Sequence, residues 1–158
     1  MRTKGFGLIE VVVGAAIMAS AFLALAGIAR FSLNIIDNAN LELRAAFLLS
    51  ESIEAVKLLR DESWTNKIAA LSNGTTYYLT FASGRWSAVT SPPAKIDDLF
   101  ERTVTFVQVR RDGFDNIVSS GGSVDAGTRK VTASITWSYL GRTYTKSIST
   151  YVANLFVN

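Results

Sequence analysis

The sequence contains no cysteine and no histidine among its 158 residues, and it has only two prolines. Without cysteine there is no disulfide framework and no thiol nucleophile, and without histidine there is no histidine-based catalytic triad. Zinc sites built from Cys and His ligands are excluded for the same reason. Much enzyme chemistry is thereby removed, and we expect a structural or binding protein with no catalytic activity.

Charge is also scarce, since 16 Lys and Arg residues stand against 13 Asp and Glu residues, a formal net charge of +3. Residues 30–63 hold 4 basic and 6 acidic side chains, and residues 64–158 hold 10 basic and 6 acidic side chains. Neither part is a polyelectrolyte, which argues against nucleic acid as a partner. The length predicts one domain with an appendage.

One long apolar run is present. Residues 6–29 carry a single charged side chain, Glu10, and 24 residues are enough for a helix to cross about 30 Å of hydrocarbon. Arg2 and Lys4 precede the run, so the positive-inside tendency keeps this end in the cytoplasm and exports the remainder. We therefore predict a single-pass protein of the cytoplasmic membrane, with its N-terminus inside and its C-terminus outside.

Helical spacing continues beyond the apolar run, and neither Pro nor Gly interrupts residues 28–73. We predict one helix from about Leu8 to Glu62, about 80 Å long at 1.5 Å per residue. Its second half carries an apolar stripe at spacings of three and four residues. The predicted stripe consists of Ile36, Ala39, Leu43, Ala46, Leu49, Ile53, Val56 and Leu59.

The period changes to two after the helix. Residues 77–81 and 85–89 predict one hairpin, residues 103–110 predict the next strand, and residues 131–139 turn back into residues 142–151. We expect residues 112–128 to form a Gly-rich loop. The predicted fold class is α+β, with an antiparallel sheet packed against the second half of the helix. The buried face of its clearest strand is predicted to be Val131, Ala133, Ile135, Trp137 and Tyr139.

Glu10 requires an explanation, because a carboxylate near the bilayer centre costs about 2.5 to 3.5 kcal/mol and less near a helix end. An ordinary secretory signal would be cleaved near residues 19–21, although its apolar core is normally shorter than this run. A permanent signal anchor would fit the length but leaves the acid without a role. A third explanation is that a positive group of another molecule reaches Glu10, where attraction is stronger than in water.

The segment from Lys4 through Gly5, Phe6 and Glu10 resembles the processing site of class III signal peptides, found in type IV pilins and type II secretion pseudopilins. Residues 45–64, AAFLLSESIEAVKLLRDESW, resemble minor pilin and pseudopilin sequences more loosely. The resemblance implies cleavage after Gly5 by a prepilin peptidase and methylation of Phe6 by the same enzyme. It also implies that Glu10 pairs with the N-terminal amine of a neighbouring subunit during filament assembly.

The resemblance implies a pilin-like fold and four segments. These are a leader at residues 1–5, a transmembrane and filament-core helix at 6–29, its amphipathic continuation at 30–63 and an extracytoplasmic antiparallel sheet domain at 64–158. The implied partners are other pilin or pseudopilin subunits, the bilayer, and a membrane assembly platform with its ATPase. A pilus, a secretion pseudopilus and a competence filament all remain open, as does a permanently anchored extracytoplasmic binding module.

Two departures from the family pattern concern the helix and the C-terminus. Many type IV pilins have a C-terminal disulfide loop, which a chain without cysteine does not form. Many also have proline where this chain has Gly27. Glycine lowers helix stability by about 1 kcal/mol relative to alanine, so Gly14 and Gly27 mark places for the helix to stretch or melt, or alternatively to pack closely.

Acidic residues suggest two further sites. Asp112, Asp115 and Asp125 lie in the expected loop, and major pseudopilins have a calcium site in a comparable loop, so calcium is a candidate cofactor. Turn chemistry alone also places Asp, Asn and Gly in loops. The other cluster, Asp97, Asp98 and Glu101, lies in a short polar connector, where we expect a solvated turn.

Basic and aromatic residues suggest two more candidate binding surfaces. Arg110 and Arg111 with Arg129 and Lys130 could form a basic patch, but we expect solvated strand ends there. We expect the three tryptophans to contribute core or helix-to-sheet contacts instead of a binding platform.

Overall fold

The computed structural model describes residues 7–155 of the chain. Its one long helix, α1 (Leu8–Glu62), has 55 residues and the bounds predicted from the sequence. The chain divides into two compact units, one ending at Glu42 and the other beginning at Leu43. Each unit is described by itself.

The first unit consists of the first part of α1. None of its side chains between residues 7 and 42 is buried, and its large apolar side chains are mostly more than half exposed. The carboxylate of Glu42 accepts a hydrogen bond from the Asn38 amide at 3.1 Å, one turn earlier in the helix. An apolar helix without a buried face in its own chain requires an apolar environment from outside.

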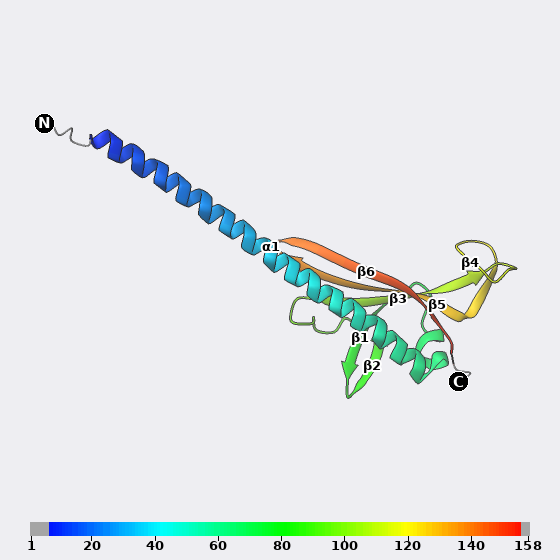
Figure 1. Cartoon of the computed structure of the whole chain (residues 1–158). Helices are drawn as coiled ribbons and strands as arrows, with labels where there is room; N and C mark the ends of the chain where they lie inside the picture. The colour runs from blue at the N-terminus through cyan, green and yellow to red at the C-terminus, as the bar shows by residue number, and fades with distance from the viewer. Residues whose placement is uncertain (1–6, 156–158) are drawn as a thin grey trace. The chain divides into compact units, whose positions relative to one another are not determined.

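The second unit is an antiparallel sheet with the last part of α1 packed on it (Figure 1). The strand order is β2-β1-β3-β5-β6, and β4 pairs with β3 beside this path. The predicted hairpins are confirmed. The strands are β1 (Thr76–Ala82), β2 (Arg85–Val89), β3 (Glu101–Arg111), β4 (Ile117–Val118), β5 (Ser123–Tyr139) and β6 (Arg142–Ala153).

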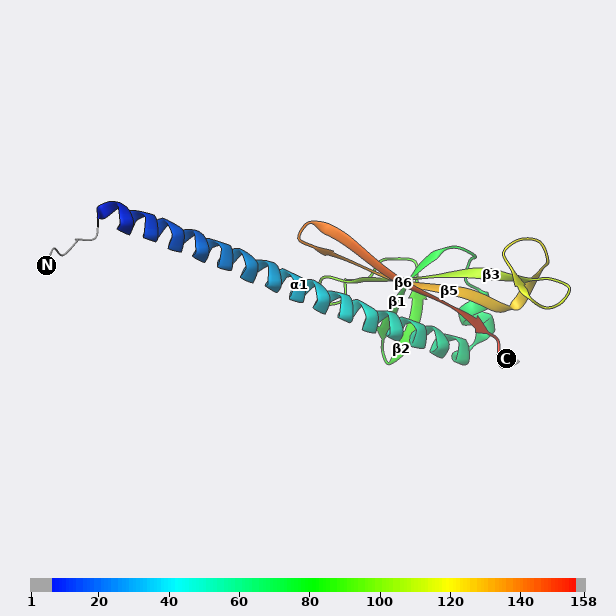
Figure 2. The same ribbon diagram turned by 45° about the horizontal axis from the view of Figure 1, so that its top comes forward.

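The core lies between one face of the sheet and α1 from Leu43 onward, which runs along that face (Figures 1 and 2). The alternation predicted for β5 is confirmed, since its four central inward side chains are at most 2% exposed and Tyr139 is half-buried. Trp137 stacks on Tyr144 of β6 with ring centroids 5.6 Å apart. The four buried side chains are Val131, Ala133, Ile135 and Trp137.

The predicted apolar stripe of the helix is wrong by about one position over part of its length. Ala46 is exposed and Ile53 only half-buried, whereas the buried helix residues are Ala45, Leu49, Ser52, Ala55, Val56 and Leu59. Small residues on the contact face let the helix approach the sheet closely. Ser52 tolerates burial because its hydroxyl donates to the carbonyl of Leu48 at 2.6 Å.

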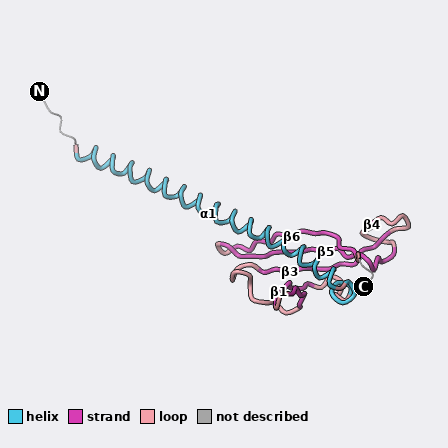
Figure 3. The backbone as a smooth tube through the Cα atoms, turned by 60° about the horizontal axis from the view of Figure 1, so that its bottom comes forward, coloured by secondary structure: helices cyan, strands magenta, loops and turns pink. Residues whose placement is uncertain are grey.

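Two elements were not predicted. A π-helix, η1 (Trp64–Ala69), follows α1 directly and buries Trp64 and Ile68 in the same core. The expected loop at residues 112–128 is only partly a loop, because β4 and the first part of β5 lie within it (Figure 3). The pairing of β3 with β5 shifts register between Gln108 and Val109, so the hydrophobic alternation read along β3 does not extend into this region.

Candidate assembly site

Glu10 lies in the first turn of α1. Its carboxylate accepts a hydrogen bond from the backbone N–H of Gly7 at 3.1 Å, while its own N–H donates to the carbonyl oxygen of Gly7 at 2.9 Å. The free N–H groups at a helix start stabilise a negative side chain in this position. Glu10 therefore caps its own helix in the single chain.

An open apolar groove lies beside this acid on the helix surface. It is lined by Glu10, Ile9, Val13, Gly14 and Ile17. A Cβ atom at Gly14 would meet nothing within 4 Å, so the glycine leaves a recess next to the carboxylate. The surface beside the carboxylate is therefore apolar and, at Gly14, free of any side chain.

The apolar character extends over the whole segment that follows. Within residues 7–155, α1 is the one helix long and apolar enough to cross a membrane, and no part of its most apolar stretch is buried. A Cβ atom at Gly27, like one at Gly14, would meet nothing within 4 Å, so neither glycine is required by packing inside the chain. The cleavage and methylation positions, Gly5 and Phe6, lie outside the described residues.

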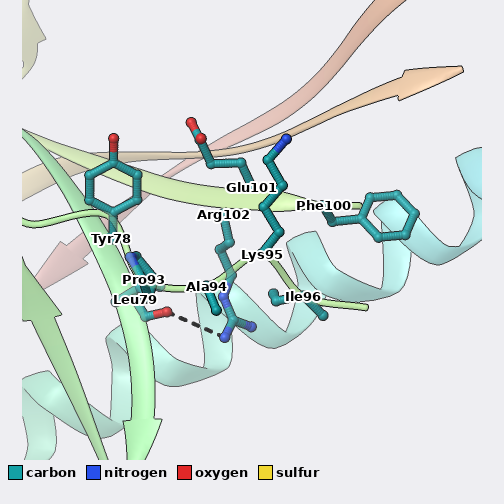
Figure 4. Close-up of a pocket in the computed structure, with 9 residues that line it drawn as sticks. All are labelled: Tyr78, Leu79, Pro93, Ala94, Lys95, Ile96, Phe100, Glu101 and Arg102. Atoms are coloured by element: carbon teal, nitrogen blue, oxygen red, sulfur yellow. Dashed lines mark hydrogen bonds between the residues drawn. The ribbon is translucent and has the colours of Figure 1, made fainter. Parts of the chain in front are cut away.

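A buried arginine links the helix to the sheet in the second unit. Arg102 is 8% exposed, and its Nη1 donates to Oε2 of Glu51 on α1 at 2.6 Å. Its guanidinium carbon lies 4.7 Å from the ring centroid of Trp86, and Nη2 donates to the carbonyl of Leu79 at 3.4 Å (Figure 4). The sequence interpretation missed this contact. Arg102 lies two residues after the buried Phe100, and residues two apart in an extended chain share a face, so the sequence did contain a signal that Arg102 faces the core.

A second contact between α1 and the sheet domain involves the polar connector. Arg44 pairs with Asp97, and its guanidinium carbon lies 5.5 Å from the ring centroid of Phe100. Asp97 and Asp98 both have positive φ, 52° and 56°, as in a tight turn. Asp97 therefore serves a structural ion pair, and Glu101 projects from β3 toward the opposite side from Arg102 (Figure 4).

The acidic loop residues are held by local contacts. Hydrogen bonds from the backbone of Asn116 and Phe114 and from the Asn116 side chain lower the pKa of Asp112 below its ordinary value. The pKa of Asp125 is lowered chiefly by a 2.7 Å hydrogen bond from Arg111, and also by Thr128 and the Gly127 N–H.

The same contacts bear on the calcium hypothesis. Arg111 lies 3.5 Å from Asp115 and 2.7 Å from Asp125, so a cation already occupies the space between these two carboxylates. In the described part of the chain, no group of three or more acidic side chains is arranged around a metal position. The hydrogen bond that Arg111 donates to Asp125 also raises the pKa of the arginine.

The expectation of solvated basic strand ends is wrong for two residues. Arg129 is 7% exposed and donates to the carbonyl of Ala69 at 3.2 Å, and Arg111 is engaged by the acids just described. Arg110 donates to the carbonyls of Gly121 and Gly122 at 2.6 and 2.8 Å. Arg110 and Arg111 therefore bind groups within the region from β3 to β5, whereas Arg129 links β5 to the end of η1.

The chain was compared with protein families, curated proteins and solved structures. No protein-family model matches the chain, and neither a curated protein nor a solved structure matches it.

Proposed function

We propose that this chain is a structural subunit, of the minor pilin or pseudopilin kind, in a type IV pilus, type II secretion pseudopilus or competence filament. The α1 helix anchors the subunit in the cytoplasmic membrane before assembly and then packs among other copies in the filament core. The sheet unit forms the part that contacts the surroundings. The role is mechanical and not catalytic, and the energy for assembly comes from a separate ATPase acting through a membrane platform.

The observation that carries this proposal is the placement of one acid at the start of an otherwise apolar, unburied helix. Cleavage after Gly5 would remove Arg2 and Lys4, lowering the net charge from +3 to +1, and would create an amine at Phe6. The exposed apolar side chains of α1 would then be covered by neighbouring helices. An amine and a carboxylate in a low-dielectric layer attract strongly, and their pairing between subunits fixes the register of one copy against the next.

A specific contact favours a second candidate, a permanently anchored extracytoplasmic binding module. Because the Glu10 carboxylate already accepts the N–H of Gly7, the acid has a capping role that needs no neighbour. In that case the leader stays in place and the helix serves only as a tether. Mass spectrometry of the mature protein separates the two: loss of residues 1–5 with a methyl group on Phe6 supports the filament subunit, and an intact leader supports the tether.

The two roles of Glu10 are separated by a pair of substitutions. Glu10→Gln keeps an oxygen that accepts the Gly7 N–H but removes the charge, whereas Glu10→Ala removes both. We expect both variants to be processed and inserted, and both to be at least about tenfold depleted from sheared filaments, which corresponds to about 1.4 kcal/mol of lost pairing. Glu54→Ala, which removes an exposed acid paired with Lys57 outside the apolar run, is the matched control and should be incorporated normally. Normal incorporation of Glu10→Gln would contradict charge pairing and leave only the capping role.

A further inference from the structure

The hairpins β1–β2 and β5–β6 have turns with the same backbone conformation and different side chains. Ser83 and Gly84 connect β1 to β2 with φ 53° and 75°, and Leu140 and Gly141 connect β5 to β6 with φ 49° and 75°. Two successive positive φ values are typical of a two-residue hairpin turn, in which Asn, Asp and Gly are favoured. An arginine follows the glycine in both turns. The first turn residue is therefore serine in one hairpin and leucine in the other.

Leu140 is unfavourable at this position for two local reasons. A positive φ is strained for a bulky side chain, and the side chain is 70% exposed to solvent. The fold does not require leucine here, because Ser83 completes the same turn in the other hairpin. An exposed leucine in a strained turn gains little from packing within its own chain. Its apolar surface is available to a partner outside the chain.

The β5–β6 turn lies at the end of the sheet unit where α1 enters it (Figures 1 and 2). The guanidinium of Arg44 lies 5.5 Å from the ring centroid of Phe100, which is 5.9 Å from that of Trp137. Val131, earlier in β5, belongs to the core cluster at the end of α1, so β5 runs from that end toward Arg44. Leu140 follows Trp137 by three residues, so at about 3.3 Å per residue the turn reaches about 10 Å beyond this level.

The chain between a bilayer and the sheet unit is short. A bilayer with its headgroups is about 40–45 Å thick, which about 27–30 helical residues cross. A crossing that begins at Leu8, the first residue of α1, therefore reaches the outer headgroups near Asp37, the first charged residue after Arg30. The seven residues from Asp37 to Arg44 add about 10 Å of helix. This length matches the reach of the turn, so the tether permits Leu140 to touch the headgroups.

The neighbours of Leu140 are of the kinds found at membrane surfaces. Tyr139, which is half-buried, precedes it, and Arg142, which is exposed, follows the turn. Tyrosine rings are enriched at the level of the headgroups, and long basic side chains bury their stems in apolar surroundings while the charge stays in water. The acid nearest to Arg44, Asp97, is already paired with it.

The small size of this apolar surface favours lipid over a protein partner. A stable protein interface takes about 800 Å² from each partner, whereas the exposed neighbours of Leu140 are Ser138, Gly141 and Arg142. A turn tethered to a bilayer needs only a small gain, because the helix already holds it close to the surface.

We propose that the β5–β6 turn is a second membrane contact, in which Leu140 inserts among the lipid headgroups of the bilayer that α1 crosses. Tyr139 and Arg142 lie beside it at the surface, and the contact orients the sheet unit on the membrane. The inference rests on the anchoring of α1 in a membrane, which the filament subunit and the tethered module share, and it does not depend on filament assembly.

The test uses the full chain, one copy in each phosphatidylcholine nanodisc, so that no second copy is present. Because the chain has no cysteine, Thr143→Cys carries a single NBD fluorophore beside the turn. Ser119→Cys carries the same fluorophore in the exposed loop between β4 and β5, at the other end of β3 and β5. Lipids with a nitroxide on the headgroup quench fluorophores that lie at the bilayer surface. We expect the fluorescence to be largely lost at Thr143→Cys and retained at Ser119→Cys.

Two reciprocal substitutions test the leucine itself. Leu140→Ser, combined with the Thr143→Cys reporter, installs the residue that the other turn already uses, so the melting temperature should be unchanged or higher. The ratio of quenched to unquenched fluorophore should nevertheless fall about tenfold, which corresponds to about 1.4 kcal/mol. Ser83→Leu is the matched control, because it places the same strained leucine in the β1–β2 turn, and it should leave quenching of the reporter unchanged.

Insertion of α1 is measured separately with Phe22→Cys, whose fluorophore should be quenched by lipids that carry the nitroxide on the acyl chain. With that fluorophore quenched, equal quenching at Thr143→Cys and Ser119→Cys would overturn the turn contact and leave the anchoring intact. Unchanged quenching after Leu140→Ser would overturn it equally. An unquenched fluorophore at Phe22→Cys would refute the anchoring, and the proposed function and the turn contact would both fall with it.

Discussion

At the residue scale, the pair formed by Arg102 and Glu51 is asymmetric, because the two partners differ in exposure. The Arg102 side chain is 8% exposed and that of Glu51 is 51% exposed. Removing the glutamate strands a buried guanidinium, whose Nε already has no hydrogen-bond partner among the described residues. Removing the arginine leaves a carboxylate that water can solvate. The energetic consequence of breaking the pair therefore depends on which partner is removed.

Methionine substitutions test this asymmetry. Glu51→Met should lower the free energy of unfolding by about 2–3 kcal/mol, because a buried charge loses its partner. Arg102→Met should cost at most about 1 kcal/mol, because the charge disappears with the pair and methionine fills the space. The check is urea denaturation of both variants in the same detergent, followed by tryptophan fluorescence. Equal losses, or a larger loss for Arg102→Met, would contradict the assignment of the buried member.

Acid should loosen the segment between β3 and β5. The pKa values of Asp112 and Asp125 lie below the ordinary value of 3.8 in the folded chain, so their contribution to stability is complete above that value. It is lost as the pH falls through the folded pKa values. Hydrogen exchange of the Phe114, Asn116 and Gly127 amides, which donate to these carboxylates, should accelerate below about pH 3.8 once corrected for intrinsic rates. The amide of Ser72, bonded to the Tyr77 hydroxyl, should not respond in that range.

Individual contacts were the least predictable part of the molecule. Trp137 was correctly assigned to the core because strand alternation alone decides its side. The contacts of Arg102, Arg111 and Arg129 were not predicted. Each of these arginines donates a hydrogen bond to a residue distant in sequence, namely Glu51, Asp125 and Ala69 respectively. Local periodicity carries no information on such partners, and a basic residue at a strand end is by default a solvated one.

At the element scale, the junction between α1 and η1 depends on one serine. Ser63 has extended backbone angles, φ −168° and ψ 112°, and its hydroxyl accepts the N–H of Asn66 at 3.2 Å. This cap ends one helix and begins the next, so that Trp64 and Ile68 turn into the core. The sequence indicated the end of the long helix. The helical segment that follows was not predicted, because it contains only one helical apolar interval, between Trp64 and Ile68, and one interval does not define a period.

Removing the cap should weaken the fold measurably. Ser63→Ala should lower the free energy of unfolding by about 1 kcal/mol, because an N–H at the helix start loses its acceptor. Ser50→Ala is a matched control, since the Ser50 hydroxyl donates to the Ala46 carbonyl on the exposed side of α1, where alanine is the better helix former. The control should be neutral or slightly stabilising. Thermal unfolding of the two variants side by side distinguishes a cap from a general effect of losing a hydroxyl.

Elements were predicted well where one period persists and poorly where two requirements compete. The long helix and both hairpins follow from uninterrupted periods of 3.6 and 2. The helix stripe was misplaced because spacings of three and four residues fit more than one adjacent face of the helix, and the face that contacts the sheet includes the small residues Ala45, Ser52 and Ala55. The alternation of inward and outward side chains predicted along β3 was also interrupted, because the pairing of β3 with β5 shifts register after Gln108.

At the scale of the whole molecule, the two units have opposite relations to water. Buried residues of α1 begin at Ala45, and the sheet unit has a core of its own that includes Leu79, Phe106 and Val131. The first unit buries none of its described side chains, and its large apolar groups remain available for lipid or for other copies. The acid at Glu10 was singled out from sequence because it is the lone charge of the run. Its hydrogen bond to Gly7 was not foreseen, because a cap depends on the local path of the backbone.

Truncation tests this division of labour. A chain beginning at Phe31 lacks the apolar run but keeps every buried residue of α1, so we expect it to be monomeric without detergent and to melt within a few degrees of the full chain. A chain beginning at Ser50 loses Ala45 and Leu49 from the core, together with the pair between Arg44 and Asp97. Loss of a buried leucine alone costs about 2–5 kcal/mol, which should lower the melting temperature by several degrees or prevent folding. Circular dichroism and light scattering of the two truncations provide the comparison. If the chain beginning at Phe31 aggregates or unfolds while the full chain in detergent does not, the apolar run contributes to folding itself, and its role is not confined to membrane anchoring and assembly.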